Sequence, residues 1–175
     1  MTLHVQPPEW PRPLPVLRLA AGVHTETIAA EPAECIALAA RMGLPAIKSI
    51  RCSFTLHPRR DGAFLAEGHL QARVTQTCVV TLEDFAARID ERFRVLFVPA
   101  GQESETDDPD SDDEIPYEGT AIDLGEAAAE QLALALDPYP RKPDAAIAES
   151  AEGEAPEAAA KPSPFAALAR LRTKP

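Results

Sequence analysis

The chain has 175 residues, 45% of them hydrophobic and 5% aromatic, and carries a formal net charge of −11. This length suits one domain with tails and is short for two domains. No apolar run approaches the roughly 18 residues of a membrane helix, and residues 1–15 lack the basic start and apolar run of a signal peptide, so we expect a cytoplasmic protein with no membrane partner.

The N-terminal part of the chain predicts an extended segment and two elements. Several prolines favour an extended segment over residues 1–13, and a strand is expected over residues 14–19. A helix is expected over residues 31–42, since Pro32 suits the first turn of a helix and Gly43 suits its end.

The middle of the chain predicts an antiparallel meander of three strands. Apolar and polar residues alternate over residues 46–56, 64–79 and 89–98, which is the pattern of strands with one buried face. The Asp61–Gly62 pair between the first two strands is typical of a tight turn. Short connections between successive strands favour antiparallel pairing.

The negative charge is concentrated in one stretch of the chain. Residues 1–100 contain 11 basic and 10 acidic side chains, and residues 141–175 contain 6 basic and 5 acidic ones. Residues 101–140 contain 13 acidic side chains and no basic one. Within this stretch, residues 101–119 have few large apolar groups, so we expect a disordered acidic insertion there. The rest of the chain is nearly neutral and can meet RNA or a basic protein locally.

A second helix is expected to follow the acidic insertion. Asp123 and Glu126 form a helix-start pattern, and Pro138 marks the end of the helix. Residues 144–175 are rich in Ala, Glu and Pro, which predicts a flexible tail that carries a PFAAL motif near its end. We therefore predict an α+β fold, with a single domain over residues 14–143 built from an antiparallel sheet of three or more strands and flanking helices.

The residue types that often carry chemistry form no convincing site. Cys35, Cys52 and Cys78 are too far apart for a zinc site, and the acidic run lacks the glycine and glutamate spacing of a calcium loop. There is no glycine-rich phosphate loop and no nucleophile elbow. We therefore predict no catalytic residue, no metal, no cofactor and no small-molecule substrate. A thiol enzyme that uses Cys78 is the alternative to a buried structural cysteine.

Arginines recur on the polar side of the predicted second and third strands. Arg73, Arg88, Arg92 and Arg94 occupy outward positions and form a candidate RNA-facing patch. The alternative interpretation is an ordinary solvated face, partly neutralised by acidic neighbours on the same strands.

Four strings follow one another along the chain: QTCVVTLE at residues 76–83, IDLGE at 122–126, LALDPYPRKP at 134–143 and PFAAL at 164–168. Together they resemble the YceD family, the large ribosomal RNA subunit accumulation proteins, and most closely its alphaproteobacterial branch. The resemblance covers nearly the whole chain and implies a role in ribosome assembly without catalytic residues. Many relatives carry Cys-x-x-Cys where this chain has Cys78 and then Thr81, which argues against a shared metal site.

The resemblance also indicates which residues contact a partner. The candidates are those within the shared strings, namely Gln76, Thr77, Cys78, Tyr139, Arg141, Lys142, Phe165 and Leu168. The expected function is a non-enzymatic factor for accumulation of large-subunit rRNA that binds rRNA, a basic ribosomal protein, or both. The alternative is a protein–protein adaptor unrelated to ribosomes that docks through its C-terminal motif. The oligomeric state stays open.

Overall fold

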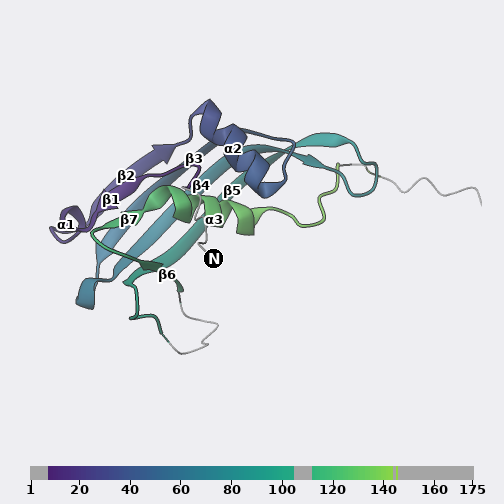
Figure 1. The fold of residues 1–175 in the computed structure, drawn as a ribbon. Helices are drawn as coiled ribbons and strands as arrows, with labels where there is room; N and C mark the ends of the chain where they lie inside the picture. The colour runs from purple at the N-terminus through teal and green to yellow at the C-terminus, as the bar shows by residue number, and fades with distance from the viewer. Residues whose placement is uncertain (1–7, 105–111, 144, 146–175) are drawn as a thin grey trace, which may run out of the picture. The chain divides into compact units, whose positions relative to one another are not determined.

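The computed structural model describes residues 8–104, 112–143 and 145, and its centre is a sheet of five strands (Figure 1). The strands are β2 (His24–Ala29), β3 (Ala46–Pro58), β4 (Phe64–Thr77), β5 (Asp84–Pro99) and β6 (Asp113–Tyr117), and they lie side by side in that order. Strands β2 to β5 pair antiparallel, and β6 pairs parallel to β5. The fold is therefore the α+β class that the sequence predicts.

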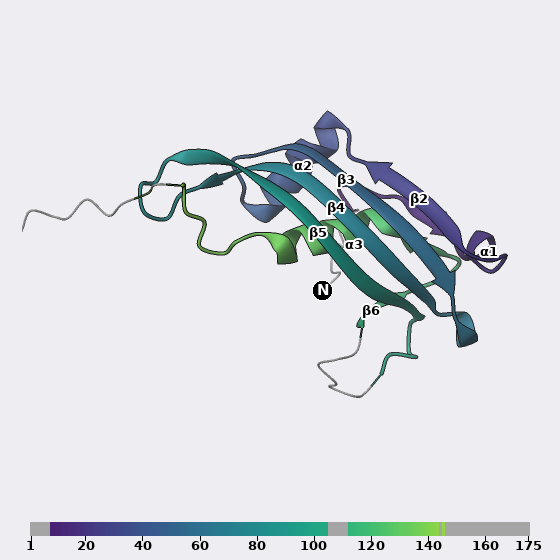
Figure 2. The same ribbon diagram turned by 180° about the vertical axis from the view of Figure 1, so that it is seen from behind.

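Two helices cover one face of this sheet, α2 (Pro32–Met42) and α3 (Leu124–Ala135). They lie in front of the strands in Figure 1 and behind them in Figure 2, so no helix of the described residues lies on the opposite face of β2 to β5. Alternation explains the asymmetry, because on β3, β4 and β5 most alternate residues are apolar and turn toward the helices. The core joins the two layers; Ile50 and Leu70 from the strands pack in one cluster with Leu38 and Leu132 from the helices.

One position in this core requires glycine. Gly68 on β4 lies between Phe54 of β3 and Phe93 of β5 in the strand register. The ring of Phe93 occupies the space over Gly68, because a Cβ atom built there would lie 2.1 Å from Cζ of Phe93. The same ring packs edge-to-face against Phe54, with 5.7 Å between ring centroids and an interplanar angle of 80°. Gly68 therefore lets an aromatic pair close over the centre of the sheet.

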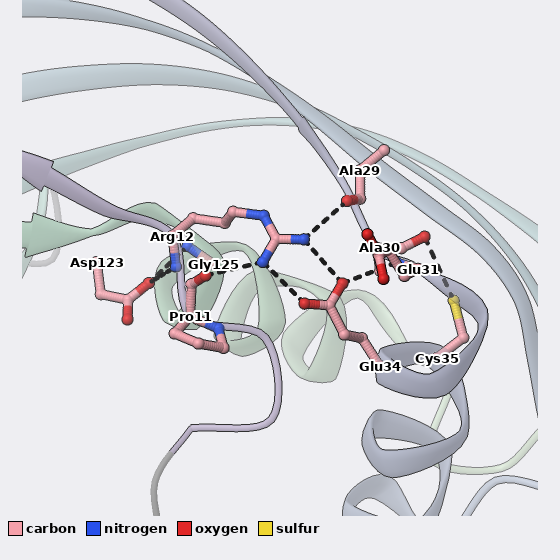
Figure 3. A network of polar contacts seen from close by, with 9 residues as sticks. All are labelled: Pro11, Arg12, Ala29, Ala30, Glu31, Glu34, Cys35, Asp123 and Gly125. Atoms are coloured by element: carbon pink, nitrogen blue, oxygen red, sulfur yellow. Dashed lines mark hydrogen bonds and ion pairs between the residues drawn. The ribbon is translucent and has the colours of Figure 1, made fainter.

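The segment before residue 16 is anchored to both helices (Figure 3). The guanidinium of Arg12 donates to both carboxylate oxygens of Glu34 on α2 at 2.8 Å and to the carbonyl oxygen of Ala29 at 3.2 Å. Asp123, the N-cap of α3, accepts hydrogen bonds from the backbone N–H groups of Arg12 and Gly125. Trp10 is buried, with 1% of its surface exposed. These contacts hold the described part of the predicted extended segment against the domain.

The N-terminal strand expected over residues 14–19 is wrong. The chain forms a short strand, β1 (Pro13–Pro15), and then one helical turn, α1 (Val16–Leu19). Strand β1 pairs antiparallel with β7 (Ala121–Asp123), whose sequence lies more than a hundred residues later. The pairing ends because the N–H of Ala20 donates back to the carbonyl of Val16, which closes a helical turn.

Elsewhere the sequence predicted the centre of the fold better than its edges. The meander of β3, β4 and β5 and the two long helices are confirmed. Strand β2 was missed, and the disorder expected over residues 101–119 does not extend to residues 113–117, which form β6. Both are edge strands, stabilised by a single neighbour. Residues 105–111 and the predicted tail over residues 144–175, apart from Ala145, lie outside the described part of the chain.

Candidate functional site

The uncovered face of the sheet is the one turned to the viewer in Figure 2. By the strand register, all five arginines of the described strands lie on this face. The register sets side chains of three strands in rows across this face. Arg51 of β3 lies opposite Gln71 of β4, and Gln71 lies opposite Asp90 of β5. In the next row Arg73 of β4 lies directly opposite Arg88 of β5. Two like charges thus face each other across one strand pair, an arrangement that sheets normally avoid.

The carboxylates on this face are already engaged by other groups. Asp90 accepts hydrogen bonds from His69 at 2.7 Å and from Gln71 at 3.0 Å. The hydrogen bond from His69, with the one from Gln71, holds the pKa of Asp90 below its ordinary value. Glu67 lies 3.9 Å from the ring of His57. The charge of Arg88 also contributes to the lowered pKa of Asp90, so a partly neutralised solvated face remains the alternative to an RNA-facing patch.

The four predicted RNA-facing arginines divide into two groups. Arg94 forms an ion pair with Asp112 at 3.1 Å, so its charge is partly satisfied. Arg73, Arg88 and Arg92 make no ion pair or side-chain hydrogen bond with any residue that the structure describes. Sequence reasoning left out Arg51, which shares this property and this face. The alternation of β3 could have found it, because Arg51 stands between Ser49 and Ser53 on the polar side of that strand.

Two shallow grooves run between these side chains. One has a volume of about 350 Å³ and is lined by Ser49, Gln71 and the three arginines Arg51, Arg73 and Arg88 among others. The second, of about 460 Å³, is lined by Ser53, Thr55, Glu67, Gly68, His69, Arg92, Phe93 and Arg94. Both grooves present donors to solvent, which suits an extended anionic partner.

A second candidate surface lies at the end of the β4–β5 hairpin, where two of the sequence strings meet. The side chain of Gln76 donates to the carbonyl of Asp137 at 3.3 Å, and the N–H of Val79 donates to the carbonyl of Pro140 at 2.9 Å. Lys142 forms an ion pair with Glu83 at 2.9 Å. The structure thus brings the Gln76–Cys78 and Tyr139–Lys142 candidates together, although about sixty residues separate them in sequence. Phe165 and Leu168 lie outside the described residues.

Cys78 lies inside this hairpin end and differs from the other two cysteines. Its surface is fully covered, but it does not belong to the main hydrophobic cluster. A hydrogen bond from Thr81, with others from backbone groups including that of Lys142, lowers the pKa of Cys78 to about 6. Burial instead raises the pKa of Cys52 to about 12 and also raises that of Cys35. The Cys78 thiolate is therefore held by donors of its own turn and by the backbone of Lys142, and a substrate could reach it only if these groups moved apart.

The described residues contain no group of three His, Cys, Asp or Glu side chains that could hold a metal ion. Within the same residues, no helix is both long and apolar enough to cross a membrane. The described residues form instead an open sheet face rich in arginine and a hairpin end fixed by a second segment of the chain. These features define a small α+β protein whose accessible surfaces suit binding.

The comparison with protein families identifies the group. The family model described as "Large ribosomal RNA subunit accumulation protein YceD" matches residues 66–172, and the chain belongs to the YceD family. This confirms the family resemblance of the sequence strings and gives the protein a role in accumulation of the large ribosomal RNA subunit. No curated protein and no solved structure matches the chain. The matched region begins within β4, so it contains Arg73, Arg88, Arg92 and Arg94 but not Arg51.

Proposed function

We propose that this protein supports accumulation of large-subunit rRNA by binding rRNA directly on the uncovered face of its sheet, without catalysing a reaction. The observation that carries the proposal is the set of exposed arginines on β3, β4 and β5, of which Arg51, Arg73, Arg88 and Arg92 form no ion pair or side-chain hydrogen bond with any described residue. Arginine donates two parallel hydrogen bonds to a phosphate group, which makes it a frequent contact to RNA. We also propose, on the sequence strings alone, that the protein is cytoplasmic and of the alphaproteobacterial branch.

The net charge of −11 does not oppose this assignment. Electrostatic attraction acts over about 10 Å at 0.1 M salt, so the charges near the contact decide its sign. On the open face of β3 to β5 the register gathers five arginines, Arg51, Arg73, Arg88, Arg92 and Arg94, and three acids, Glu67, Asp84 and Asp90. The local balance is positive, whereas the acidic residues of the chain are concentrated after residue 100.

The absence of a catalytic role is part of the same proposal. The one thiol with a lowered pKa, Cys78, has no exposed surface, and the donors that lower its pKa belong to its own turn and to the backbone of Lys142. A thiolate satisfied in this way stabilises the turn rather than attacking a substrate. The cysteine is thus proposed as a structural element of the hairpin end.

The hairpin end supports a second candidate function, docking on a protein partner. Leu82 and Tyr139 are 78% and 72% exposed, and Leu82 holds a left-handed backbone conformation with φ of 57°. Exposed apolar groups beside the ion pair of Lys142 and Glu83 resemble the mixed surface of a protein interface. In this candidate the residues Gln76, Thr77, Cys78, Tyr139, Arg141 and Lys142 shape the surface. Phe165 and Leu168, which lie outside the described residues, are partner-binding candidates on the sequence strings alone. The partner is a ribosomal protein or, for an adaptor, a protein unrelated to ribosomes.

Ultraviolet crosslinking in cells separates the two functions. The proposal predicts that large-subunit rRNA is recovered covalently with the wild-type protein and that the R88E/R92E variant recovers several-fold less. The R59E/R60E variant makes the same charge change outside the sheet face and is the matched control. Recovery of rRNA that is equal in all three proteins refutes binding through this face. Recovery of proteins only, with the chain at the top of a sucrose gradient, favours the adaptor.

A further inference from the structure

We propose that Arg51, Arg73 and Arg88 form one phosphate-binding site, and that its occupant is the sugar–phosphate backbone of duplex rRNA. This inference rests on the rRNA-binding function proposed above and narrows it to a site. It adds Arg51, which lies before the region matched by the family model, and it states that the contact is to phosphate rather than to bases.

The three arginines converge because of the strand register. Arg73 lies opposite both Ser49 of β3 and Arg88 of β5, and Arg51 is one row further along β3. All three side chains are exposed, and all three line the groove of about 350 Å³. Ser49 and Gln71 line the same groove and offer uncharged donors between the guanidinium groups.

Among the described residues, this groove is lined by three arginines and by no acidic side chain. Asp90 is the acid of β5 that lies nearest in the register, and its two oxygens accept hydrogen bonds from His69 and Gln71. Arg73 and Arg88 repel each other across the strand pair. A phosphate group placed between them would relieve this repulsion and would use their planar forks of N–H donors. Unrelieved like charges at one place in a fold indicate an anionic ligand.

The composition of the open face selects backbone contacts over base contacts. Proteins that bind unpaired nucleotides usually stack the bases on aromatic side chains. The open-face positions of β2 to β5 carry mainly Thr, Ser, Arg, His, Gln and acidic residues, with the aliphatic residues Ala29, Leu65, Ala86, Leu96 and Val98, but no Phe, Tyr or Trp within the described strands. The aromatic residues Phe54, Phe64, Phe93 and Phe97 turn to the covered face. A surface of donors without stacking platforms suits the regularly spaced phosphates of an RNA duplex.

The test measures affinity of the full chain for a fluorescein-labelled RNA hairpin with a duplex stem, over a series of salt concentrations. Three proteins are compared: wild type, the groove variant R51Q/R73Q/R88Q and the matched control R18Q/R59Q/R60Q. The control removes the same charge from exposed arginines that line neither of the two grooves described above. Thermal melts of all three proteins check folding, and the groove variant should melt no lower than the control because it loses a repulsive pair.

We expect the groove variant to bind the RNA hairpin at least about tenfold more weakly at low salt. The slope of log affinity against log salt should be smaller in magnitude by about 2 to 3, because each phosphate contact contributes about 0.9 to that slope. The control should stay within about twofold of wild type. Equal weakening of the two variants, or an unchanged salt slope in the groove variant, overturns the site and leaves rRNA binding intact. Competition by polyglutamate as effective as unlabelled RNA also overturns it, since the groove would then suit an acidic protein.

A second measurement separates failure of the site from failure of the function. Pyrophosphate should raise the melting temperature of wild type and the control more than that of the groove variant. If wild type binds no RNA hairpin, the rRNA function and the RNA occupant are both overturned. If pyrophosphate then raises the melting temperature of wild type but not of the groove variant, the groove binds a free phosphate compound. If pyrophosphate does not raise the melting temperature of wild type, the phosphate-binding site itself is refuted.

Discussion

Reversing the charge of Arg88 should make the protein more stable while weakening its contact with RNA. Arg88 lies directly opposite Arg73 in the register of β4 and β5, on the open face of the sheet. Directly opposed like charges destabilise a strand pair, and opposed unlike charges contribute roughly 0.2–1 kcal/mol. Both side chains are exposed, so solvent and salt screen the interaction. Arg88 also attracts Asp90, and R88E loses that attraction, which offsets part of the gain. We therefore expect R88E to raise the free energy of unfolding by about 0.2–1 kcal/mol at low salt.

The measurement is urea denaturation at low and at high salt, with R73E and the double variant R73E/R88E completing a cycle. Each single variant should gain stability, whereas the double variant restores a like-charge pair and should fall back to about the wild-type value. High salt should shrink all these differences. All three variants should bind the RNA hairpin more weakly than wild type. If R88E is no more stable than wild type at low salt, the two guanidinium groups do not repel each other in the folded protein and the argument for an anionic ligand fails.

Two further predictions concern the covered face and the hairpin end. Gly68→Ala should cost about 1–3 kcal/mol because the new Cβ displaces the ring of Phe93, and G68A/F93A should lose less than the sum of its single variants when measured by urea denaturation. Thiolate absorbance near neutral pH should titrate with a midpoint of about 6 and vanish in Cys78→Ser, but persist in Cys52→Ala. The lowered pKa of Cys78 further means that the free energy of unfolding rises with pH from about 6 to about 8.5, the pKa of a free thiol. This rise should be absent in Cys78→Ser. A thiolate absorbance midpoint near 8.5 would refute the hydrogen bonds assigned to this thiol.

The sequence predicted the centre of the sheet because strong local patterns and burial coincide there. Over residues 46–56, alternation agrees with one face packed on the helices, and the helix expected over residues 31–42 is confirmed as α2, from Pro32 to Met42. Strand β1 depended on a distant partner, since its residues pair with β7 at Ala121–Asp123. No window along the chain contains that information. Strand β6 was missed because its acidic composition predicts disorder, whereas parallel pairing with β5 overrides it.

The candidate surfaces were predicted in part for the same reason. Alternation alone assigned Arg73, Arg88 and Arg92 to a polar face, but only the register shows that Arg51 adjoins them and that Arg73 opposes Arg88. The hydrogen bond between Val79 and Pro140 joins two sequence motifs, and their spacing along the chain does not predict that they are neighbours in the fold. Local pattern determines which face a residue occupies, and tertiary pairing determines its neighbours.

The acidic segment should weaken the RNA contact through one ion pair that the structure describes. Asp112 lies 3.1 Å from Arg94, and this ion pair competes with a contact between Arg94 and a phosphate of the RNA. Removing its charge in D112N frees Arg94 to contact a phosphate, which should tighten binding of the RNA hairpin by about twofold or more and steepen the salt slope by up to about 0.9. The matched control is D61N, which makes the same charge change in a turn where asparagine tolerates the left-handed backbone, with φ of 61°.

The comparison of the two variants separates a local effect from a general one. If the acidic residues act only through the net charge, D61N and D112N should raise the affinity equally, because both move the formal charge from −11 to −10. The ion pair predicts that D112N alone changes the salt slope, and that D112N has no effect once Arg94 is replaced in R94Q. A slope that is the same in both variants would show that Arg94 takes no part in the contact, and would confine the RNA-binding face to the arginines nearer the hairpin end.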